Sequence, residues 1–394
     1  MRIALSTSVY GPGGMGRYVL ELCRALEPWA GRHEFFFFAA EAHRTVFAPF
    51  EAWARVVWVP GSFHTPWADV LWHQCCLPGW VRRLKIDLWH VPSYRRLPHS
   101  AGCPSVATVH DLAPFHIPGK YGWARMLFAR WWVPPVARRQ ERIVVPSACT
   151  RGDVLRWLRV NPQRVRLIPN GVDHARFHPG DRQEAAARVR SWWGMEKPFL
   201  LHVARLEHPA KGHLRVLEAF ERFRSMTGLD WELVFAGPDA RGASHVRRAV
   251  AASPARSAVR ILGCVPEACL PDLYRAARAL VFPSEVEGFG LPVLEAMACG
   301  SPVLATPSDA VSEVLGEGYP AMLRGGPNRW AEEIAVFAAS ETLGAQLSRA
   351  GLRRAACFSW QRTAEAMVAL YEETAGDCGR LRKGGGVEGG GVCS

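Results

Sequence analysis

The 394-residue sequence predicts an α/β protein with two doubly wound parallel sheets, one in each half of the chain. Length is the first observation, because so long a chain exceeds one ordinary core and divides into domains of roughly 150–200 residues. The second is a regular alternation of short apolar segments with helical segments, which is typical of parallel strands joined by crossover helices. The third is that this alternation starts again after Gly194–Pro198, which indicates a linker.

The first half begins with a strand, a glycine loop at Gly11–Gly16 and a helix at Arg17–Leu26. A later helix, Gln183–Trp192, is interpreted as a connection, so the first domain is expected to span residues 1–190. The expected strands of this half are Ile3–Val9, Glu34–Ala40, Ala54–Val59, Asp87–Val91, Ser105–Val109, Arg142–Val145 and Val165–Ile168.

The second domain is expected to span residues 191–357, followed by a helix over 358–375 and a glycine-rich, disordered tail over 376–394. Its expected helices are Leu214–Arg224, Val246–Ala252 and Leu270–Ala277. Its expected strands are Phe199–Val203, Trp231–Ala236, Val259–Leu262, Ala279–Phe282 and Pro302–Ala305.

The most informative segment is Ser284–Gly300, where Glu287 and Glu295 flank a glycine-rich turn that opens a helix. Pro292 stands where a first helical turn accepts proline. A turn of this kind directs free backbone N–H groups and the positive end of the helix dipole at a phosphate. The two carboxylates suit hydroxyl groups, so the segment predicts a ligand with an anionic middle and polyol ends, such as a nucleotide sugar.

Two further pairs follow predicted strands at their carboxyl ends. Arg205 and Lys211 come after Phe199–Val203, where arginine can grip a pyrophosphate with two hydrogen bonds and lysine adds a point charge. His110 and Asp111 follow another strand, where the histidine could bind a substrate hydroxyl or act as an acid or base. Taken alone, each pair is better explained structurally, the first as a surface loop and the second as a capping aspartate beside a partly buried histidine.

The loop Gly11–Gly16 also matches the G-x-G-x-x-G pattern of dinucleotide-binding enzymes, and Glu41 follows the next strand, where a dehydrogenase keeps its ribose-binding acid. Against a dehydrogenase, Thr7–Tyr10 separates the strand from the glycines, whereas that fingerprint turns directly off its strand. We therefore expect the loop to let the diphosphate of a different ligand approach the backbone.

The net charge of +12 is concentrated in the first half. Residues 1–190 hold 26 Lys and Arg against 13 Asp and Glu, and 13 of the 16 tryptophans precede residue 195. Arginine and tryptophan together suggest a face that meets anionic lipid or nucleic acid. The segments that indicate it are Arg130–Arg142, which contains both residue types, and the basic Val81–Lys85, which directly follows Trp80. The alternative is an arginine-rich proteome, with solvated helix faces and buried tryptophans.

Cysteine usage and hydropathy indicate a cytoplasmic protein. The 11 cysteines include no C-x-x-C pair and no cluster with histidine, as expected of reduced thiols. No run of about 18 apolar residues predicts a spanning helix. The start Met1–Ser6 is followed too soon by glycines for a signal peptide.

These motifs together resemble a known family. Glu287–Gly300 resembles the E-x7-E signature of the retaining glycosyltransferases of family 4, the group 1 glycosyltransferases, whose GT-B fold has two Rossmann-like domains facing across a cleft. Gly13–Tyr18 resembles the family's N-terminal glycine loop, Thr108–Leu112 its sugar-proximal histidine segment, and Val203–Gly212 its phosphate-binding arginine and lysine. Phe358–Trp360 resembles the start of its C-terminal helix, which crosses back onto the first domain.

The resemblance implies roles for individual residues. Arg205 and Lys211 would hold the donor diphosphate, Glu295 the ribose hydroxyls and Glu287 the donor sugar, and His110 would contact that sugar from the other domain. The implied catalytic residues are His110, Arg205, Lys211 and Glu287. The implied donor contacts are Gly13, Gly14, Gly16, Arg205, Lys211, Val265, Glu287, Gly288, Phe289, Gly290, Leu291 and Glu295.

Such enzymes retain the anomeric configuration and usually need no metal, and the chain has no D-x-D pair to hold one. The resemblance implies a hexosyltransferase, mannosyl or glucosyl by family frequency, that uses a GDP- or UDP-sugar as substrate and no cofactor. The expected acceptor is a glycan or lipid-linked saccharide of cell-envelope polysaccharide or lipopolysaccharide biosynthesis. The expected location is the cytoplasm, with the basic first domain on the inner face of the plasma membrane, and no nucleic-acid partner is expected.

Two alternatives stay open at this point. One is a synthase that uses a sugar nucleotide and a small soluble acceptor. The other is a catalytically silent binding subunit, although an inactive paralogue would be free to lose Glu287, Glu295, Arg205, Lys211 and His110.

Overall fold

The computed structural model describes residues 1–11, 13–63, 65–117, 120–320 and 323–384, and the chain forms two compact units. Unit 1 contains Met1–Pro169 with Trp360–Ser394, and unit 2 contains Asn170–Ser359. The expected boundary at residue 190 is therefore too late. Helix α9 (Arg182–Trp193) belongs to unit 2, because Arg188 binds both carboxylate oxygens of Asp272 at 2.8 and 3.0 Å.

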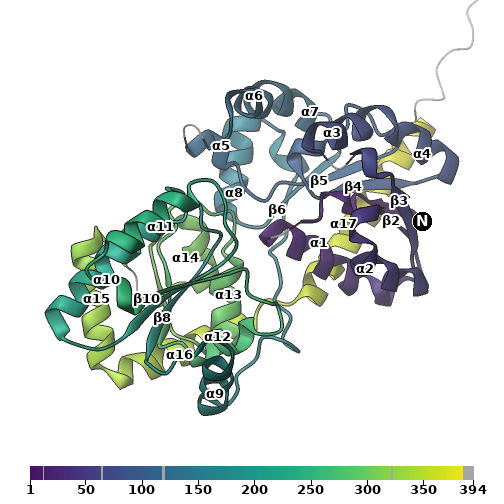
Figure 1. Ribbon diagram of the computed structural model, residues 1–394. Helices are drawn as coiled ribbons and strands as arrows, with labels where there is room; N and C mark the ends of the chain where they lie inside the picture. Colours follow the sequence, from purple (N-terminus) through teal and green to yellow (C-terminus); the bar gives the residue numbers. More distant parts are fainter. Residues whose placement is uncertain (12, 64, 118–119, 321–322, 385–394) are drawn as a thin grey trace, which may run out of the picture. The chain divides into compact units, whose positions relative to one another are not determined.

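Unit 1 is built on a seven-stranded parallel sheet with the order β3-β2-β1-β4-β5-β6-β7 (Figure 1). The expected strand Ile3–Val9 ends early, at Leu5, because the Ser6 hydroxyl accepts a hydrogen bond from the Trp89 indole at 2.8 Å and the chain then turns through a 3-10 helix. The strands are β1 (Arg2–Leu5), β2 (Glu34–Ala40), β3 (Arg55–Val59), β4 (Leu88–Val91), β5 (Ser105–Thr108), β6 (Arg142–Val145) and β7 (Val165–Leu167).

Both faces of this sheet are covered, which explains why β2 is a continuous apolar run. Alternate residues of the strand point to opposite faces, so Phe38 packs against Trp89 while Phe37 packs against Phe50. The helices of unit 1 are α1 (Gly14–Ala25), α2 (Arg44–Phe47), α3 (Pro66–Cys75), α4 (Leu77–Leu84), α5 (Ala113–His116), α6 (Trp123–Leu127), α7 (Val133–Ala137), α8 (Ala148–Asp153) and α17 (Trp360–Gly384).

Helix α17 packs on α1 and β4 within unit 1. The predicted disorder of residues 376–394 is wrong for 376–384, which are helical, and residues 385–394 lie outside the described residues. Charges hold this end of the helix against the sheet. Arg142 on β6 donates to Glu373 at 3.0 Å and to Asp377 at 2.6 Å, and Arg166 on β7 donates to Glu373 at 2.7 Å.

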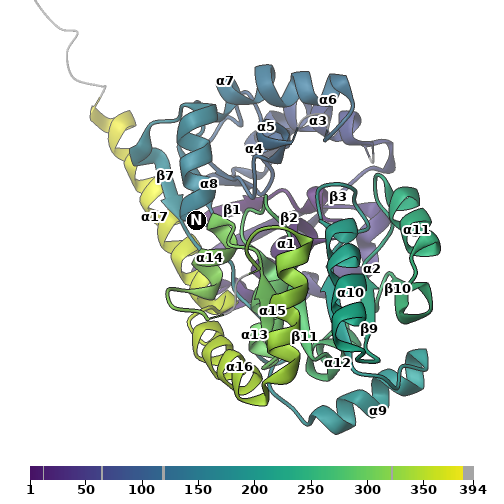
Figure 2. The same ribbon diagram turned by 90° about the vertical axis from the view of Figure 1, so that its left-hand side faces the viewer.

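Unit 2 is built on a five-stranded parallel sheet with the order β10-β9-β8-β11-β12. Helices α10 and α15 pack side by side, as Figures 1 and 2 both show. The strands are β8 (Phe199–Val203), β9 (Glu232–Ala236), β10 (Val259–Gly263), β11 (Ala279–Phe282) and β12 (Val303–Ala305). The helices besides α9 are α10 (His213–Thr227), α11 (Ala243–Ala252), α12 (Leu270–Ala276), α13 (Leu291–Ala298), α14 (Asp309–Leu315), α15 (Pro327–Ala339) and α16 (Glu341–Ala355).

The strand order sets where each sheet can bind a ligand. In unit 2 the chain adds β9 and β10 on one side of β8, then returns to add β11 on the other side. In unit 1 the same reversal lies between β1 and β4. Open α/β sheets bind ligands outside the carboxyl ends of their strands at such reversal points.

Within the described ranges, no helix combines the length and the apolar character needed to cross a bilayer.

Candidate functional site

The loop after β8 carries the first cation of the candidate site in unit 2. The Arg205 guanidinium donates to the Glu207 carboxylate at 2.7 Å. Glu207 is buried, while 44% of the arginine side chain remains exposed. The carboxylate therefore orients the guanidinium and leaves it accessible. Glu207 was not predicted from the sequence, although an acid two residues after the arginine predicted to bind phosphate was a signal for such an anchor.

The second cation pairs with one of the two signature glutamates. The Lys211 ammonium donates to the Glu287 carboxylate at 2.6 Å, and both side chains are more than four-fifths buried. Lys211 follows β8 and Glu287 follows β11, which are neighbours in the sheet. The ion pair thus lies at the reversal point of unit 2, where ligands of open sheets bind.

The signature turn continues into α13. Gly290 caps this helix with φ at +103°, a left-handed conformation that favours glycine. In the first turn Pro292 has no N–H and Val293 donates to the Gly290 carbonyl at 3.0 Å, so the Leu291 N–H is the one that the helix itself leaves without an acceptor. Glu295 lies one turn into the helix and is buried, and the Tyr274 hydroxyl of α12 donates to it at 3.0 Å. The turn therefore places a positive helix end between the two carboxylates.

The remaining residues of unit 2 that were predicted to contact the sugar-nucleotide donor differ in which of their atoms a ligand can reach. Phe289 and Leu291 are buried, and the Phe289 ring packs edge-on against Phe358 at 5.9 Å, so their backbone rather than their side chains is what a ligand can meet. Gly288 lies in the same turn. Val265 is half-buried in the loop after β10, which is separated from β8 by β9.

In unit 1 the glycine loop leads into α1. Gly13 caps the helix, and Gly14 is its first residue, so the helix starts earlier than the expected Arg17. Gly16 lies in the first turn, where an added Cβ would stand 1.8 Å from the Gly11 carbonyl oxygen. This close approach of two backbone segments requires glycine at residue 16.

His110 follows β5 and is held by its neighbours. Its Nε2 lies 3.1 Å from the Pro92 carbonyl oxygen, and its ring meets Tyr18 edge-on at 4.6 Å. Because a carbonyl only accepts, Nε2 carries the proton and Nδ1 is an acceptor. Burial lowers the pKa of His110 to about 4, so the ring is neutral near pH 7.

A buried chain of hydrogen bonds lies behind His110. The Tyr18 and Thr108 hydroxyls are 3.2 Å apart, and His90 Nε2 lies 2.8 Å from the same Thr108 oxygen. The Tyr371 hydroxyl of α17 lies 2.7 Å from His90 Nδ1. Burial lowers the pKa of His90 to about 3, so this histidine is also neutral. The sequence analysis singled out neither His90 nor Tyr371.

The predicted site residues thus fall into two groups. Unit 2 brings together at the carboxyl edge of its sheet Arg205, Lys211, Glu287, Gly288, Phe289, Gly290, Leu291 and Glu295. Unit 1 holds Gly13, Gly14, Gly16 and His110. Among the residues that the structure describes, no three His, Cys, Asp or Glu side chains group so as to hold a metal ion.

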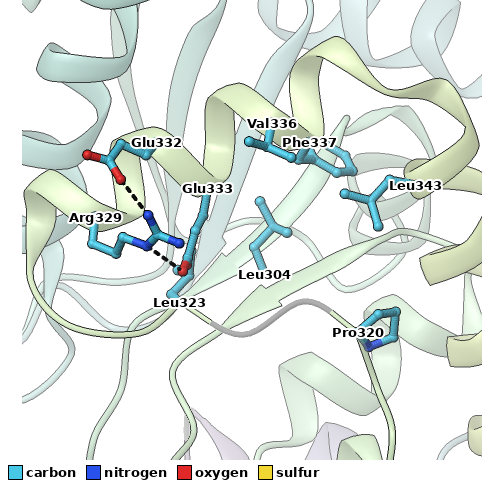
Figure 3. A pocket seen from close by; sticks show the side chains of 9 residues that line it. All are labelled: Leu304, Pro320, Leu323, Arg329, Glu332, Glu333, Val336, Phe337 and Leu343. Carbon is cyan, nitrogen blue, oxygen red and sulfur yellow. Dashed lines mark hydrogen bonds and ion pairs between the residues drawn. The ribbon is translucent and has the colours of Figure 1, made fainter.

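A pocket of about 220 Å³ in unit 2 lies away from these residues (Figure 3). Its lining is largely apolar, with Leu304 and Phe337 among the side chains. Its cation, Arg329, already pairs with Glu332 at 2.7 Å and Glu333 at 3.4 Å. The pocket is therefore a poor site for a phosphate.

Two family models match the chain almost end to end. Residues 12–176 match Glycosyltransferase Family 4, and residues 183–354 match Glycosyl transferases group 1. The chain belongs to this glycosyltransferase family. The resemblance found in the sequence is thereby confirmed, and so is the predicted GT-B fold of two parallel-sheet α/β domains, which the structural neighbours share.

The relatives it resembles include two proteins named D-inositol 3-phosphate glycosyltransferase. That of Segniliparus rotundus is 34% identical over 68% of this chain and 61% of its own length. That of Geodermatophilus obscurus is 32% identical over 78% of this chain and 67% of its own length. The matched part of the chain therefore covers between 61 and 67% of the length of these two relatives.

Among solved structures, Anabaena Alr3699/HepE in complex with UDP aligns with a TM-score of 0.74 over 95% of this chain and 100% of that one. At 18% identity, this likeness supports the fold alone.

Proposed function

We propose that this chain transfers a hexosyl group, mannosyl or glucosyl, from a nucleoside-diphosphate sugar to a hydroxyl acceptor, with retention of the anomeric configuration and without a metal or cofactor. The observation that carries the proposal is the Lys211–Glu287 pair of 2.6 Å beside the first turn of α13. A cation, a carboxylate and a helix N-terminus at one sheet edge suit a ligand with both phosphate and sugar hydroxyls.

The cations would act on the leaving group. As the sugar leaves, negative charge grows on the diphosphate, and fixed positive groups stabilise that charge without having to reorganise. Arg205, oriented by Glu207, and Lys211 supply two such groups, and the N-terminal turn of α13 supplies a third. Glu295 would accept hydrogen bonds from the ribose.

The acceptor proton needs a destination, and we propose the leaving phosphate of the donor. Glu287 is engaged by Lys211, and His110 is neutral with Nδ1 as an acceptor, which suits a hydrogen bond from a sugar hydroxyl. The bond between the sugar's anomeric carbon and the diphosphate oxygen would break as the acceptor oxygen attacks, and that leaving oxygen would take the acceptor's proton on the face of the sugar from which the diphosphate departs. Attack on that same face retains the anomeric configuration.

The structural neighbour crystallised with UDP favours a UDP-sugar as the first donor to test, with a GDP-sugar as the second. For the acceptor we propose a glycan or lipid-linked saccharide of envelope polysaccharide or lipopolysaccharide biosynthesis, reached at the cytoplasmic face of the membrane by the basic unit 1.

A small phosphorylated polyol is the second candidate acceptor, because the relatives named above act on inositol phosphate by name. The carboxyl end of β4 suits such a ligand. Arg95 lies there with its guanidinium 4.9 Å from the centre of the Tyr121 ring, and Arg96 beside it is held by Asp69 at 2.8 Å.

The test is a panel of UDP- and GDP-sugars assayed for thermal stabilisation of the protein and for slow donor hydrolysis, with and without a chelator. We expect one donor to stabilise the protein and to be hydrolysed, and proton NMR to show the α-anomer released first from an α-linked donor. First release of the β-anomer would refute retention, and activity abolished by the chelator would refute metal independence. A well-folded protein that responds to no donor would refute the proposed activity.

The acceptor is tested with the donor so identified. Transfer to inositol phosphate but not to lipid-linked saccharides would select the second candidate and refute the first.

A further inference from the structure

One helical segment of unit 1 has an unusual outer face. Helices α6 and α7 are joined by a π-helical turn, Phe128–Trp132, into one continuous segment over residues 123–137. Its inner side, including Ala129 and Val133, is buried in the unit. Its outer side shows Trp123 and Trp131 to solvent with 78% and 76% of their surface exposed. An amphipathic helix of a soluble protein normally places polar residues there.

The neighbouring helix α3 extends this face. Its Trp67 ring meets Phe128 edge-on at 5.4 Å, and Phe128 stacks on Trp132 at 6.5 Å. Figures 1 and 2 both show α3 beside α6. The aromatic surface, as we call it, comprises Trp67, Leu71, Trp123, Leu127, Trp131 and Trp132, each with between 46 and 78% of its surface exposed.

These residues form a patch, whereas single exposed apolar side chains are normal on a protein surface. Other large rings of the same unit are fully buried, for example Trp72 and Trp89 at 2 and 0% exposure. Exposure of the patch is thus not a general feature of tryptophan in this chain. Large contiguous apolar patches mark sites that meet a partner or a membrane.

The charge around the aromatic surface indicates which of the two it meets. Residues 112–140 contain no Asp or Glu, although they contain Lys120, Arg125, Arg130, Arg138 and Arg139. Arg125 and Arg130, which alternate with the exposed rings along the helix, are themselves exposed. Tryptophan prefers the boundary between headgroups and acyl chains, and arginine binds the phosphates just above it.

We propose that the aromatic surface docks unit 1 on an anionic lipid bilayer. The occupant is the lipid surface, because a basic apolar face complements negative headgroups over an apolar interior. The acid that α3 contributes, Asp69, is buried and paired with Arg96 at 2.8 Å. The inference deepens the proposed function by assigning its membrane contact to named side chains. It rests on that proposed location and not on the donor chemistry.

The experiment is co-sedimentation of the full chain with vesicles of phosphatidylcholine alone and of equal parts phosphatidylcholine and phosphatidylglycerol. We expect strong binding to the anionic vesicles at low salt and weak binding to the others. Replacing Trp123 and Trp131 by Ser should reduce the partition coefficient roughly tenfold or more per ring. Arg125→Gln and Arg130→Gln should each reduce it about fivefold at low salt and less at high salt.

The matched controls are Trp192→Ser, a 41%-exposed ring of unit 2, and Arg222→Gln, which neutralises an exposed arginine there. Both should bind vesicles as the wild type does. Vesicles whose acyl chains carry bromine should quench the tryptophan fluorescence of the wild type and not that of the double Trp123/Trp131 variant. Quenching of the wild type shows that the rings insert among the acyl chains, whereas adsorption by charge alone would leave the fluorescence unchanged. Circular dichroism and the melting temperature confirm that the variants fold, because exposed substitutions change stability little.

The proposal is overturned if the protein stays in the supernatant with every vesicle, or if the double variant binds as well as the wild type. It is also overturned if the substitutions dissociate an oligomer, seen by sedimentation velocity, without changing vesicle binding. Nucleotide-induced thermal stabilisation, measured on the same samples, reports the donor site of unit 2. A failure of lipid binding is thereby distinguished from a failure of the proposed activity.

Discussion

Replacing Lys211 by Met should separate the catalytic role that we propose for this residue from its structural role. The ammonium donates to Glu287 at 2.6 Å, and both side chains are less than a fifth exposed. Methionine keeps the apolar stem of the lysine and removes the charge. The Glu287 carboxylate is then left mostly buried without its cation.

The magnitude follows from that burial. A hydrogen bond to a charged group contributes about 1.5–3 kcal/mol, and an unpaired carboxylate in a mostly buried position also loses solvation. We expect Lys211→Met to lower the free energy of unfolding of the unit by about 2–3 kcal/mol. Turnover of the donor should fall by about 10²- to 10³-fold, because the variant lacks the preorganised cation that we propose acts on the leaving group.

The control is the double variant Lys211→Met/Glu287→Gln. Removing the charge of the carboxylate as well should restore most of the lost stability, yet donor turnover should stay as low as in the single variant or lower. Urea unfolding gives the first quantity and donor hydrolysis gives the second. If the double variant is no more stable than Lys211→Met, the two side chains are not coupled as the 2.6 Å contact requires, and the reasoning is refuted.

Three further predictions concern other parts of the fold. Gly16→Ala should lower the unfolding free energy of unit 1 by about 1–3 kcal/mol, since its Cβ would overlap the Gly11 carbonyl, and unchanged urea stability would contradict this. Burial lowers the pKa of His213 to about 2, so the unfolded chain takes up the proton first and stability falls by about 1.4 kcal/mol per pH unit as the pH drops below about 6.5. His213→Phe should remove that loss, so its melting temperature should fall less than that of the wild type between about pH 8 and pH 5. An equal fall in both proteins would count against the prediction. Tyr274→Phe removes the hydroxyl that donates a hydrogen bond to Glu295, and it should weaken the binding of a nucleoside diphosphate about tenfold. The binding of a 2′,3′-dideoxy analogue should weaken less, and equal losses for both ligands, measured by calorimetry, would exclude the proposed role of Glu295 at the ribose.

The parts of the fold that follow from local pattern were predictable. A run such as Glu34–Ala40 can only be a strand buried on both faces, and β2 has those bounds. The signature turn was also predictable, because Pro292 stands in a glycine-rich segment where a first helical turn accepts proline, and α13 begins at Leu291. These features depend on neighbours in the sequence.

Features that depend on distant pairs were not predictable. Lys211 and Glu287 were each selected as candidates, but they are 76 residues apart and only the neighbouring strands β8 and β11 bring them together. The domain boundary failed for the same reason. Helix α9 has the composition of a connecting helix, and it belongs to unit 2 because Arg188 meets Asp272 there.

The hydrogen-bond partners of buried polar groups inside apolar segments could not be predicted either. His90 lies in a fully buried strand, and nothing in its neighbours signals the partners that it finds in Thr108 and Tyr371. A lone histidine in such a strand reads as part of the core. Only the packing of α17 on β4 supplies the second partner of its ring.

The most direct test of the central claim is calorimetric titration of the protein with UDP, UMP, GDP and GMP, repeated with Lys211→Met and Arg205→Gln. We expect the protein to prefer one base and to bind its diphosphate more tightly than its monophosphate. Each variant should lose this advantage while its affinity for the monophosphate changes little. Equal binding of mono- and diphosphate by the wild type, or variants that bind the diphosphate as tightly as the wild type does, would contradict it.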